Sequence, residues 1–341
     1  ETAHRLCDWV EMKLDALGSS QFALTFFGGE PLLNQPVMFA MAERLWRATR
    51  ERGVGMRINV ITNGLLLTPA VVNRLEPFGL NGVKITLDGD QQTHDRMRPL
   101  RGGQGTFDRI IENIRQVADR CNVSIGGNFD EDTVDSYPAL LDFLGDQAFA
   151  DSLVKVSFKP VIREKPAAAP PGLIPLTAVG ADDKPLGGTC MTSAGSGTGS
   201  ACDSCNLLDT KMSYLREETK KRGFATIDGL HMGPCDIHRR HAYTVGPDGS
   251  LYACPGFTGE VTSATGHIGG QLEERYRRSA ADFEALAAWR SCGDCAFIPV
   301  CAGGCSVASQ SELGDMHQPA CHKESMESAL VSFAMDASSA A

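Results

Sequence analysis

Several common features are absent from this sequence. It has no excess of basic residues, because 32 Lys and Arg stand against 42 Asp and Glu and give a formal net charge of −10. Such a chain has no basic field for nucleic acid or an anionic membrane, so neither is an expected partner. No apolar run approaches the roughly 20 residues of a membrane span, and no signal segment stands at the start. We therefore expect a cytoplasmic protein with reduced thiols.

Aromatic residues and histidines are also few. Aromatics make up 7% of the 341 residues, and the eight histidines follow no metal-ligand spacing. His238 and His241, which lie beside Cys235, are therefore expected to be solvated or near a metal rather than bound to it. The remaining composition, with 42% hydrophobic and 22% charged residues, is that of a globular protein with one large domain or two ordinary ones.

The first half of the chain alternates strand-like and helix-like patterns. Short β-branched or aromatic runs lie at residues 24–27, 58–62, 83–87, 123–126 and 154–158. Helical patterns between them lie at residues 37–53, 69–79 and 106–120. This repetition predicts βα units around a parallel sheet. The sheet is interpreted as a partial barrel whose working face is the C-terminal end of its strands.

The second half has a different amino-acid composition. Pro-, Gly- and Ser-rich stretches after about residue 166 predict a linker or mobile loop. Only short strand signals, at residues 242–245 and 250–254, follow residue 230, where most of the remaining cysteines lie. A small, loop-rich region of this kind needs covalent or metal staples because its core is thin.

Seven of the 12 cysteines form one ordered series. Gly249 separates the first two, a C-x2-C-x5-C-x3-C run follows, and a single cysteine ends the series. In chain order they are Cys235, Cys254, Cys292, Cys295, Cys301, Cys305 and Cys321. In a reducing compartment such clustering favours metal over disulfides. The spacing alone suits either a zinc ribbon or an iron–sulfur site.

This series resembles the SPASM region of radical SAM enzymes at every position. In that family the region holds two auxiliary [4Fe–4S] clusters. The resemblance assigns the outer cluster to Cys292, Cys295, Cys301 and Cys321, and the inner cluster to Cys235, Cys254 and Cys305. It leaves the inner cluster without a fourth thiolate, which either comes from Cys190, Cys202 or Cys205 or leaves an iron open to substrate. The remaining Cys7 and Cys121 are expected to be small buried hydrophobic residues.

The first half carries a second resemblance. "LTFFGGEPLLN" is similar to the GGEP motif of the same family, which meets the amino group of S-adenosylmethionine. Gly28 and Gly29 let the backbone approach a ligand closely. Glu30 offers an acceptor to an ammonium group, and Pro31 stiffens the turn.

Later strand ends complete this cofactor-binding set. "TNG", which contains Asn63, and "ITLDG", which contains Asp88, end strands as they do in the family. "HDRMR" resembles the family's H-D-x-x-R. By this resemblance Thr86 contacts the ribose, Arg98 the methionine carboxylate and Asn128 the adenine.

The C-x3-C-x2-C motif that binds the radical cluster in this family is missing from the sequence. Only 27 residues precede Gly28, and the opening "ETAHRLCDWV" resembles the helix after the cluster loop. We expect the first strand and the cluster loop, with its [4Fe–4S] cluster, to lie upstream. A degenerate family member that has lost this cluster is the rival hypothesis.

The fold expected from the resemblance is a partial (β/α)6 TIM-like radical SAM barrel followed by a small SPASM domain. The expected parts are a barrel at 1–165, a bridging region at 166–230, SPASM at 231–330 and a tail at 331–341. The implied activity is reductive cleavage of S-adenosylmethionine to a 5′-deoxyadenosyl radical, which abstracts hydrogen from a peptide or protein partner. A reductant such as flavodoxin or ferredoxin supplies the electrons.

A maturase that forms a thioether or similar crosslink in a ribosomally made peptide is the favoured hypothesis. An anaerobic sulfatase-maturing enzyme shares this architecture. Those relatives carry Asp directly after the second SPASM cysteine, however, where this chain has Pro255. A non-catalytic iron–sulfur electron-transfer or scaffold protein is the third hypothesis.

Overall fold

The computed structural model describes residues 1–161, 203–226, 235–270 and 273–339. The chain divides into two compact units, each made of several segments. Unit 1 comprises Glu1–Lys159, Leu215–Ile227 and Tyr243–Ala280, and unit 2 comprises Pro160–Tyr214, Asp228–Ala242 and Ala281–Ala341. The domain boundaries expected from composition stay a prediction.

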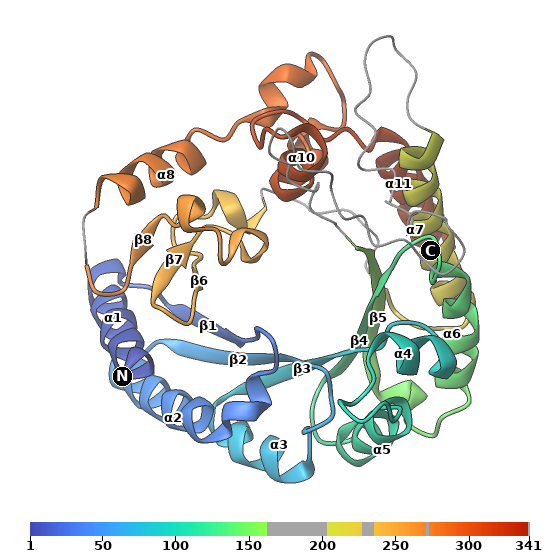
Figure 1. Ribbon diagram of the computed structural model, residues 1–341, viewed down its shortest axis with the longest axis horizontal. Coiled ribbons are helices and arrows are strands. Elements are labelled where there is room, and N and C mark those ends of the chain that lie inside the picture. The colour runs from blue at the N-terminus through green and yellow to red at the C-terminus, as the bar shows by residue number, and fades with distance from the viewer. Residues whose placement is uncertain (162–202, 227–234, 271–272, 340–341) are drawn as a thin grey trace, which may run out of the picture. The chain divides into compact units, whose positions relative to one another are not determined.

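A five-stranded sheet organises unit 1, and its strands follow chain order across the sheet (Figure 1). The strands are β1 (Gln21–Phe26), β2 (Gly55–Thr62), β3 (Leu80–Thr86), β4 (Val123–Phe129) and β5 (Leu153–Pro160). Neighbours from β1 to β4 pair in parallel. Each strand contains most of one run expected from the sequence, so the expected parallel α/β fold is confirmed.

Helices cover one face of this sheet (Figure 1). They are α1 (Thr2–Leu17), α2 (Gln35–Glu51), α3 (Pro69–Leu75), α4 (Gln91–Met97), α5 (Phe107–Val117) and α6 (Tyr137–Gly145). Alternate strand residues such as Val83 and Ile85 are buried against them. Phe22, Leu24 and Phe26 of β1 pack on the cluster that α1 and α2 form. The other face carries the intervening residues, which are more polar and more exposed.

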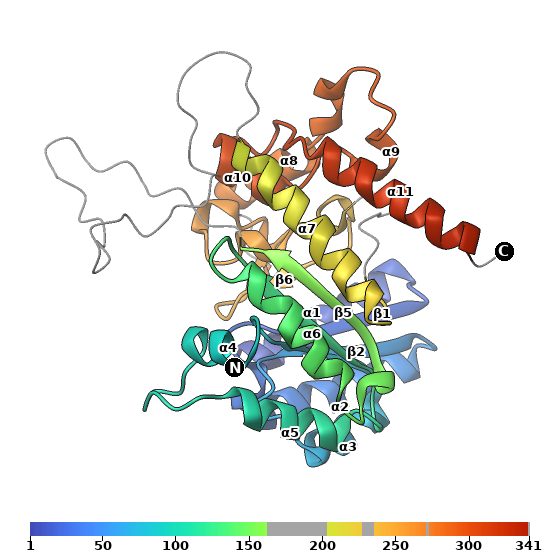
Figure 2. The ribbon, with the colours of Figure 1, turned by 90° about the vertical axis from the view of Figure 1, so that its right-hand side faces the viewer.

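The remaining parts of unit 1 are shorter. A three-stranded antiparallel sheet contains β6 (Thr244–Val245), β7 (Ser250–Tyr252) and β8 (Gly266–His267). Helix α7 (Asp203–Lys221) starts in unit 2 and ends in unit 1. After it, Ala225 accepts a hydrogen bond of 2.8 Å from the Val156 N–H of β5, which lies beside α6 (Figure 2). Arg222 also pairs with Asp142 of α6.

Unit 2 is rich in loops and short helices in its described part. Its elements after the end of α8 (Glu274–Glu284) are η9 (Ala288–Cys292), α9 (Ile298–Cys301), α10 (Ser306–Leu313) and α11 (Lys323–Ser339). Within the described ranges, every helix is too short or too polar to cross a membrane.

Candidate functional site

The turn after β1 is tied to the end of β2 by the carboxylate of Glu30. Its Oε1 accepts hydrogen bonds from Leu32 N (3.0 Å) and Thr62 Oγ1 (2.8 Å). Its Oε2 accepts one from Asn63 N at 2.8 Å. Gly28 opens this turn with φ of 129°, a value that residues with a side chain rarely adopt. The "GGEP" turn is therefore held against the neighbouring strand end by a single acidic side chain.

The loop after β2 is fixed from two sides. Thr62 is buried, and its Oγ1 accepts from Gly64 N at 3.1 Å. The Oδ1 of Asn63 accepts from Leu65 N at 2.9 Å, so this side-chain oxygen shapes the turn. From α5, the buried amide of Asn113 donates to Gly64 O at 2.8 Å. Asn113 could not be predicted as a site residue, because an isolated polar residue on a helix has many uses.

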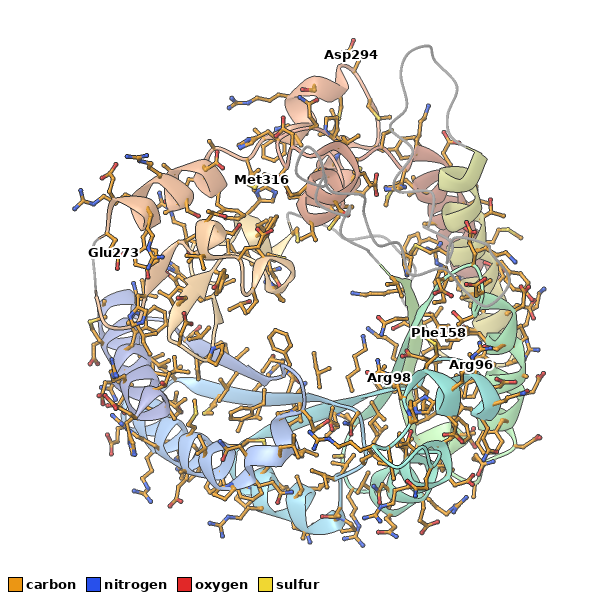
Figure 3. The ribbon with its side chains drawn as sticks, viewed as in Figure 1. Arg96, Arg98, Phe158, Glu273, Asp294 and Met316 are labelled. Atoms are coloured by element: carbon orange, nitrogen blue, oxygen red, sulfur yellow. The ribbon has the colours of Figure 1, made fainter. Side chains whose placement is uncertain are left out.

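Asp88 connects the ends of β3 and β4. This residue is 4% exposed. Its Oδ1 accepts from Asn128 N at 2.8 Å, and its Oδ2 accepts from Arg98 Nε at 2.6 Å. The Arg98 side chain is 39% exposed and follows α4 (Figure 3). Since Nε takes the Asp88 bond, the two terminal guanidinium nitrogens keep donors for a ligand.

A buried histidine shapes the loop between Asp88 and Arg98. The Nδ1 of His94 accepts from Asp88 N at 3.1 Å, so the proton of a neutral ring lies on Nε2. Nε2 is 3.1 Å from Thr106 Oγ1, which donates in turn to Arg98 O at 2.8 Å. Burial lowers the pKa of His94 and keeps the ring neutral. His94 lies within the "HDRMR" motif, whose spacing alone does not predict this positioning role.

The same loop is anchored by the acidic residue of the "HDRMR" motif. Asp95 Oδ1 accepts from Thr106 N (2.7 Å) and Phe107 N (2.8 Å), the first amides of α5. Unpaired amides at a helix start need an acceptor of this kind. The motif's His and Asp thus position the backbone, while its Arg reaches the site.

Gly127 of β4 is required by close packing. A Cβ built on it would lie 2.2 Å from Leu87 O and 2.9 Å from the Tyr137 ring. The Tyr137 hydroxyl donates to Asn128 O at 2.8 Å and so fixes the end of the strand. Thr86 pairs with Gly126 across β3 and β4 and lies on the face opposite the helices.

The expected cofactor-binding residues therefore follow the C-terminal ends of four parallel strands, where ligands of such sheets bind. The set is Gly28, Gly29, Glu30, Pro31, Asn63, Thr86, Asp88, Arg98 and Asn128. Their individual contacts with S-adenosylmethionine stay a prediction.

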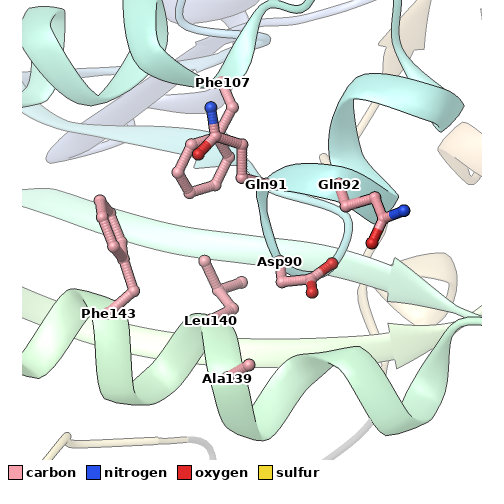
Figure 4. Close-up of a pocket in the computed structure, with 7 residues that line it drawn as sticks. All are labelled: Asp90, Gln91, Gln92, Phe107, Ala139, Leu140 and Phe143. Atoms are coloured by element: carbon pink, nitrogen blue, oxygen red, sulfur yellow. The ribbon is translucent and has the colours of Figure 1, made fainter.

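A pocket of about 410 Å³ lies elsewhere, in the helical layer of unit 1 (Figure 4). It is lined by the start of α4 together with Phe107 of α5 and Leu140 and Phe143 of α6. These residues belong to the helix-covered side of the sheet. The pocket is therefore separate from the strand-end site.

In unit 2, two glycines bring cysteine-bearing segments close to one another. A Cβ on Gly303 would lie 2.8 Å from Ala288 Cβ and from Trp289 N, on the segment that leads to Cys292. A Cβ on Gly304 would lie 2.3 Å from Ala320 O, next to Cys321. Both glycines have positive φ, of 85° and 90°. "CAGGC" therefore allows three segments of the cysteine series to pack together.

The pKa of Cys292 depends on the other three thiols that are expected to hold the outer cluster. The pKa of Cys292 is raised by burial and further by the nearby thiols of Cys301, Cys295 and Cys321. Within the described residues, no three His, Cys, Asp or Glu side chains are grouped to hold one metal ion. The assignment of these four thiols to an outer cluster stays a prediction.

The other cysteines differ in their surroundings. Cys254 ends the β7 segment in unit 1 and accepts a hydrogen bond from Gly256 N at 3.4 Å. Cys235 and Cys305 are exposed residues of unit 2. Their assembly with Cys254 as inner-cluster ligands stays a prediction. Near Cys235, the His238 ring packs edge-on against Trp289 with centroids 5.4 Å apart, a structural contact rather than a ligand role.

The possible extra ligands are described only in part. Cys190 and Cys202 lie outside the described residues, and Cys205 belongs to the first turns of α7. In unit 1, by contrast, burial raises the pKa of both Cys7 and Cys121 to about 11. Cys7 packs in the α1–α2 cluster and is buried, whereas Cys121 is partly exposed. Both thiols remain protonated at neutral pH, as expected for cysteines with no ligand role.

The strand-end geometry agrees with a comparison against protein families. A model of the Radical SAM superfamily matches residues 10–144. The chain contains a radical SAM superfamily domain. That domain includes β1 to β4 and every residue of the strand-end set. Radical SAM proteins bind S-adenosylmethionine and a [4Fe–4S] cluster.

Curated relatives match over part of their length. Fe-coproporphyrin III synthase of Methanosarcina barkeri (strain Fusaro / DSM 804) is 30% identical over 128 residues, which is 36% of this chain and 29% of that protein. GTP 3′,8-cyclase of Synechococcus sp. (strain WH7803) is 32% identical over 114 residues, 32% of this chain and 33% of that protein. The matches thus span about a third of these relatives.

Solved structures match over nearly the whole chain. Native anSMEcpe with bound AdoMet has a TM-score of 0.63 at 14% identity, covering 95% of this chain and 85% of that one. Streptococcus suis SuiB bound to precursor peptide SuiA has a TM-score of 0.54 at 14% identity, covering 94% and 69%. At such low identity the likeness shows the fold alone.

Proposed function

We propose that this chain belongs to a radical SAM enzyme that modifies a peptide, and that its unit 2 is an auxiliary-cluster domain of the SPASM type. The observation that carries the proposal is the pairing, in one chain, of a radical SAM domain with a glycine-packed set of cysteines. When bound, S-adenosylmethionine and its cluster supply a radical that removes hydrogen from carbon. The favoured outcome is a crosslink such as a thioether in a ribosomally made peptide.

The residues of unit 1 would hold S-adenosylmethionine by its charged methionine part. Glu30 accepts from three donors, and a carboxylate has about four lone-pair sites. One site is thus left for an ammonium group. The terminal nitrogens of Arg98 would take the methionine carboxylate, because its Nε is already held by Asp88. Thr86 and Asn128 would contact ribose and adenine.

Support for auxiliary clusters comes from the cysteines of unit 2. Cys292, Cys295, Cys301 and Cys321 form the proposed outer ligand set, and the pKa of Cys292 is raised by burial and by the other three thiols, which suits a shared cluster. Cys235 and Cys305 of unit 2 and Cys254 of unit 1 form the proposed inner set. An inner cluster with three thiolates either binds a further thiol or keeps an iron open for a substrate atom.

Two features help to choose among substrates. SuiB has been crystallised with its precursor peptide SuiA, and anSMEcpe with the Kp18Cys peptide. Both structures share the fold of this chain, which favours a peptide as its substrate.

The residue after Cys254 is Pro255, the first residue of a 3-10 helix. Because proline cannot act as the base expected of a sulfatase-maturing enzyme, that alternative is disfavoured.

Iron analysis with cysteine variants tests the cluster assignment. We expect the anaerobically reconstituted protein to hold about eight irons in two auxiliary clusters, plus about four where the upstream motif is present. Cys301→Ala should remove about four of them. Cys121→Ala is the matched control, because its thiol is protonated and lies outside unit 2. Zinc without labile sulfide, or equal iron loss in both variants, would contradict the assignment.

Turnover tests the reaction class. The full-length protein, reduced with dithionite, should release 5′-deoxyadenosine from S-adenosylmethionine, measured by mass spectrometry. A peptide encoded beside the gene should lose the mass of two hydrogens when a crosslink forms. Intact clusters without any cleavage of S-adenosylmethionine would instead support the electron-transfer or scaffold hypothesis.

A further inference from the structure

Three lysines gather on the open face of the unit 1 sheet. On β3, Val83 and Ile85 are buried against the helices, so Lys84 between them faces the opposite way. On β5, Val156 is buried and Phe158 packs on the Tyr137 ring of α6, with centroids 4.4 Å apart (Figure 3). Strand alternation therefore places Lys155 and Lys159 on the same open face as Lys84.

The Lys84 side chain lies over a glycine of β4, the strand between β3 and β5. In register, Lys84 pairs with Ser124 and Thr86 pairs with Gly126. A Cβ built on Gly126 would nevertheless lie 2.3 Å from Lys84 Cε and 3.0 Å from its Nζ. The lysine stem thus leans across β4, two residues toward the C-terminal strand ends. Any larger residue at position 126 would displace it.

The three ammonium groups have no counter-ion among the residues that the structure describes. Burial lowers the pKa of Lys84, and the charges of Lys159 and Lys155 lower it further. Both carboxylates of the strand-end set are already engaged, Asp88 by Arg98 and Asn128 and Glu30 by backbone and hydroxyl donors. An acidic chain of net charge −10 therefore keeps three positive charges, one of them partly buried, on the face that carries its cofactor-binding residues. Such a cluster is stabilised by binding an anion.

We propose that Lys84, Lys155 and Lys159 form a substrate subsite that binds the side-chain carboxylates of an acidic segment of the peptide. This assignment rests on the proposed peptide-modifying function and adds to it a substrate class. Lys84 lies two residues before Thr86 on the same strand face, so a peptide held there lies beside the expected cofactor-binding residues. Ammonium groups serve as point charges and accept carboxylates in many orientations, which suits a flexible peptide.

The test is a binding measurement that needs no turnover. Fluorescein-labelled hexaglutamate and hexaglutamine peptides are titrated into the reconstituted full-length protein and followed by anisotropy at fixed ionic strength. We expect hexaglutamate to bind and hexaglutamine not to bind. Lys84→Met should weaken hexaglutamate binding about tenfold or more. Lys84→Arg keeps the positive charge and should bind hexaglutamate nearly as well as the wild type. The control Lys221→Met removes the same charge from an exposed, ion-paired lysine of unit 1 and should leave binding unchanged.

Gly126→Ala separates a built subsite from general attraction. This variant keeps all three charges but fills the space that the Lys84 stem occupies. We expect it to weaken hexaglutamate binding while circular dichroism shows an intact fold. Equal binding by wild type, Lys84→Met and Gly126→Ala would overturn the subsite. Binding of inorganic triphosphate in preference to hexaglutamate would overturn its assignment to a peptide carboxylate.

Two further readouts keep this inference distinct from the proposed function. S-adenosylmethionine affinity, measured by calorimetry, should be the same in Lys84→Met and wild type, because the lysines bind the peptide and not the cofactor. A changed affinity would overturn the subsite by assigning these lysines to the cofactor. Release of 5′-deoxyadenosine tests the proposed function alone, so a subsite failure with intact cleavage leaves the radical chemistry standing.

Discussion

Replacing Glu30 by glutamine should destabilise unit 1 even in the absence of any ligand. The carboxylate accepts from three donors, Leu32 N, Asn63 N and Thr62 Oγ1, through both of its oxygens. Glutamine has the same shape but only one acceptor oxygen, and its NH₂ group is a donor. However the amide is turned, the NH₂ faces one of the two backbone N–H groups. At least one hydrogen bond to a charged acceptor is therefore lost.

The size of the destabilisation follows from the number of hydrogen bonds that Glu30→Gln loses. A hydrogen bond to a charged group contributes about 1.5–3 kcal/mol, and the N–H group that is left unpaired adds to its loss. We expect Glu30→Gln to lower the free energy of unfolding by roughly this amount. Urea titration followed by circular dichroism, without S-adenosylmethionine, measures it. Glu76→Gln is the control, because Glu76 is exposed and no hydrogen bond to its side chain is present among the described residues.

A second measurement on the same variant addresses the ligand. If the remaining lone pair of Glu30 accepts the ammonium of S-adenosylmethionine, affinity should fall about ten- to hundredfold, measured by calorimetry under anaerobic conditions. An unchanged urea midpoint would refute the cross-strand role deduced from the hydrogen bonds. Unchanged affinity would refute the ammonium contact and leave Glu30 as a purely structural residue.

Three other outcomes are expected. Gly304→Ala should reduce the iron content of the reconstituted protein without affecting S-adenosylmethionine binding, because the new methyl would lie 2.3 Å from Ala320 O beside a proposed cluster ligand. His94 has a pKa below its ordinary value of 6.5, so its contribution to stability is present above pH 6.5 and is lost as pH falls toward the lowered value. Urea midpoints of wild type and His94→Ala should therefore converge as the pH falls below 6.5. Lys84→Met should raise the urea midpoint at neutral pH, with a smaller gain as the pH rises toward the ordinary lysine pKa, because burial penalises the charged amine.

The strands were predictable where apolar runs mark them. β5 begins one residue before its expected run, because the β-branched Val154 stands at its start. β1, β2 and β3 each begin three residues before their expected runs, and in β1 and β2 these first residues pair with one another through the backbone. Backbone pairing leaves no mark on side-chain composition, so strand beginnings were the weakest part of the prediction.

The sequence motifs point to the strand-end residues but not to the hydrogen bonds that connect them. The motifs name Glu30, Asp88 and Arg98, yet nothing in the spacing says that Asp88 and Arg98 form an ion pair. That ion pair depends on the path of the chain through α4. A hydrogen bond between His94 and Thr106, which are 12 positions apart in the sequence, holds this path. The proposed lysine subsite could not be predicted from the sequence. Its members come from β3 and β5, and only the order of strands in the sheet brings them together.

The hydrogen bonds of Glu30 and Asp88 couple ligand binding to the order of the strand ends. Each carboxylate accepts from a backbone N–H of the next strand along the chain, Asn63 for Glu30 and Asn128 for Asp88. A ligand that completes these carboxylate networks stabilises the folded state by mass action, by about 2.7 kcal/mol at one hundred times its Kd. That gain is similar to the cost expected for losing one charged hydrogen bond at Glu30. Saturating S-adenosylmethionine should therefore raise the urea midpoint of wild type clearly and that of Glu30→Gln much less, since the variant loses both the cross-strand bond and the ligand contact.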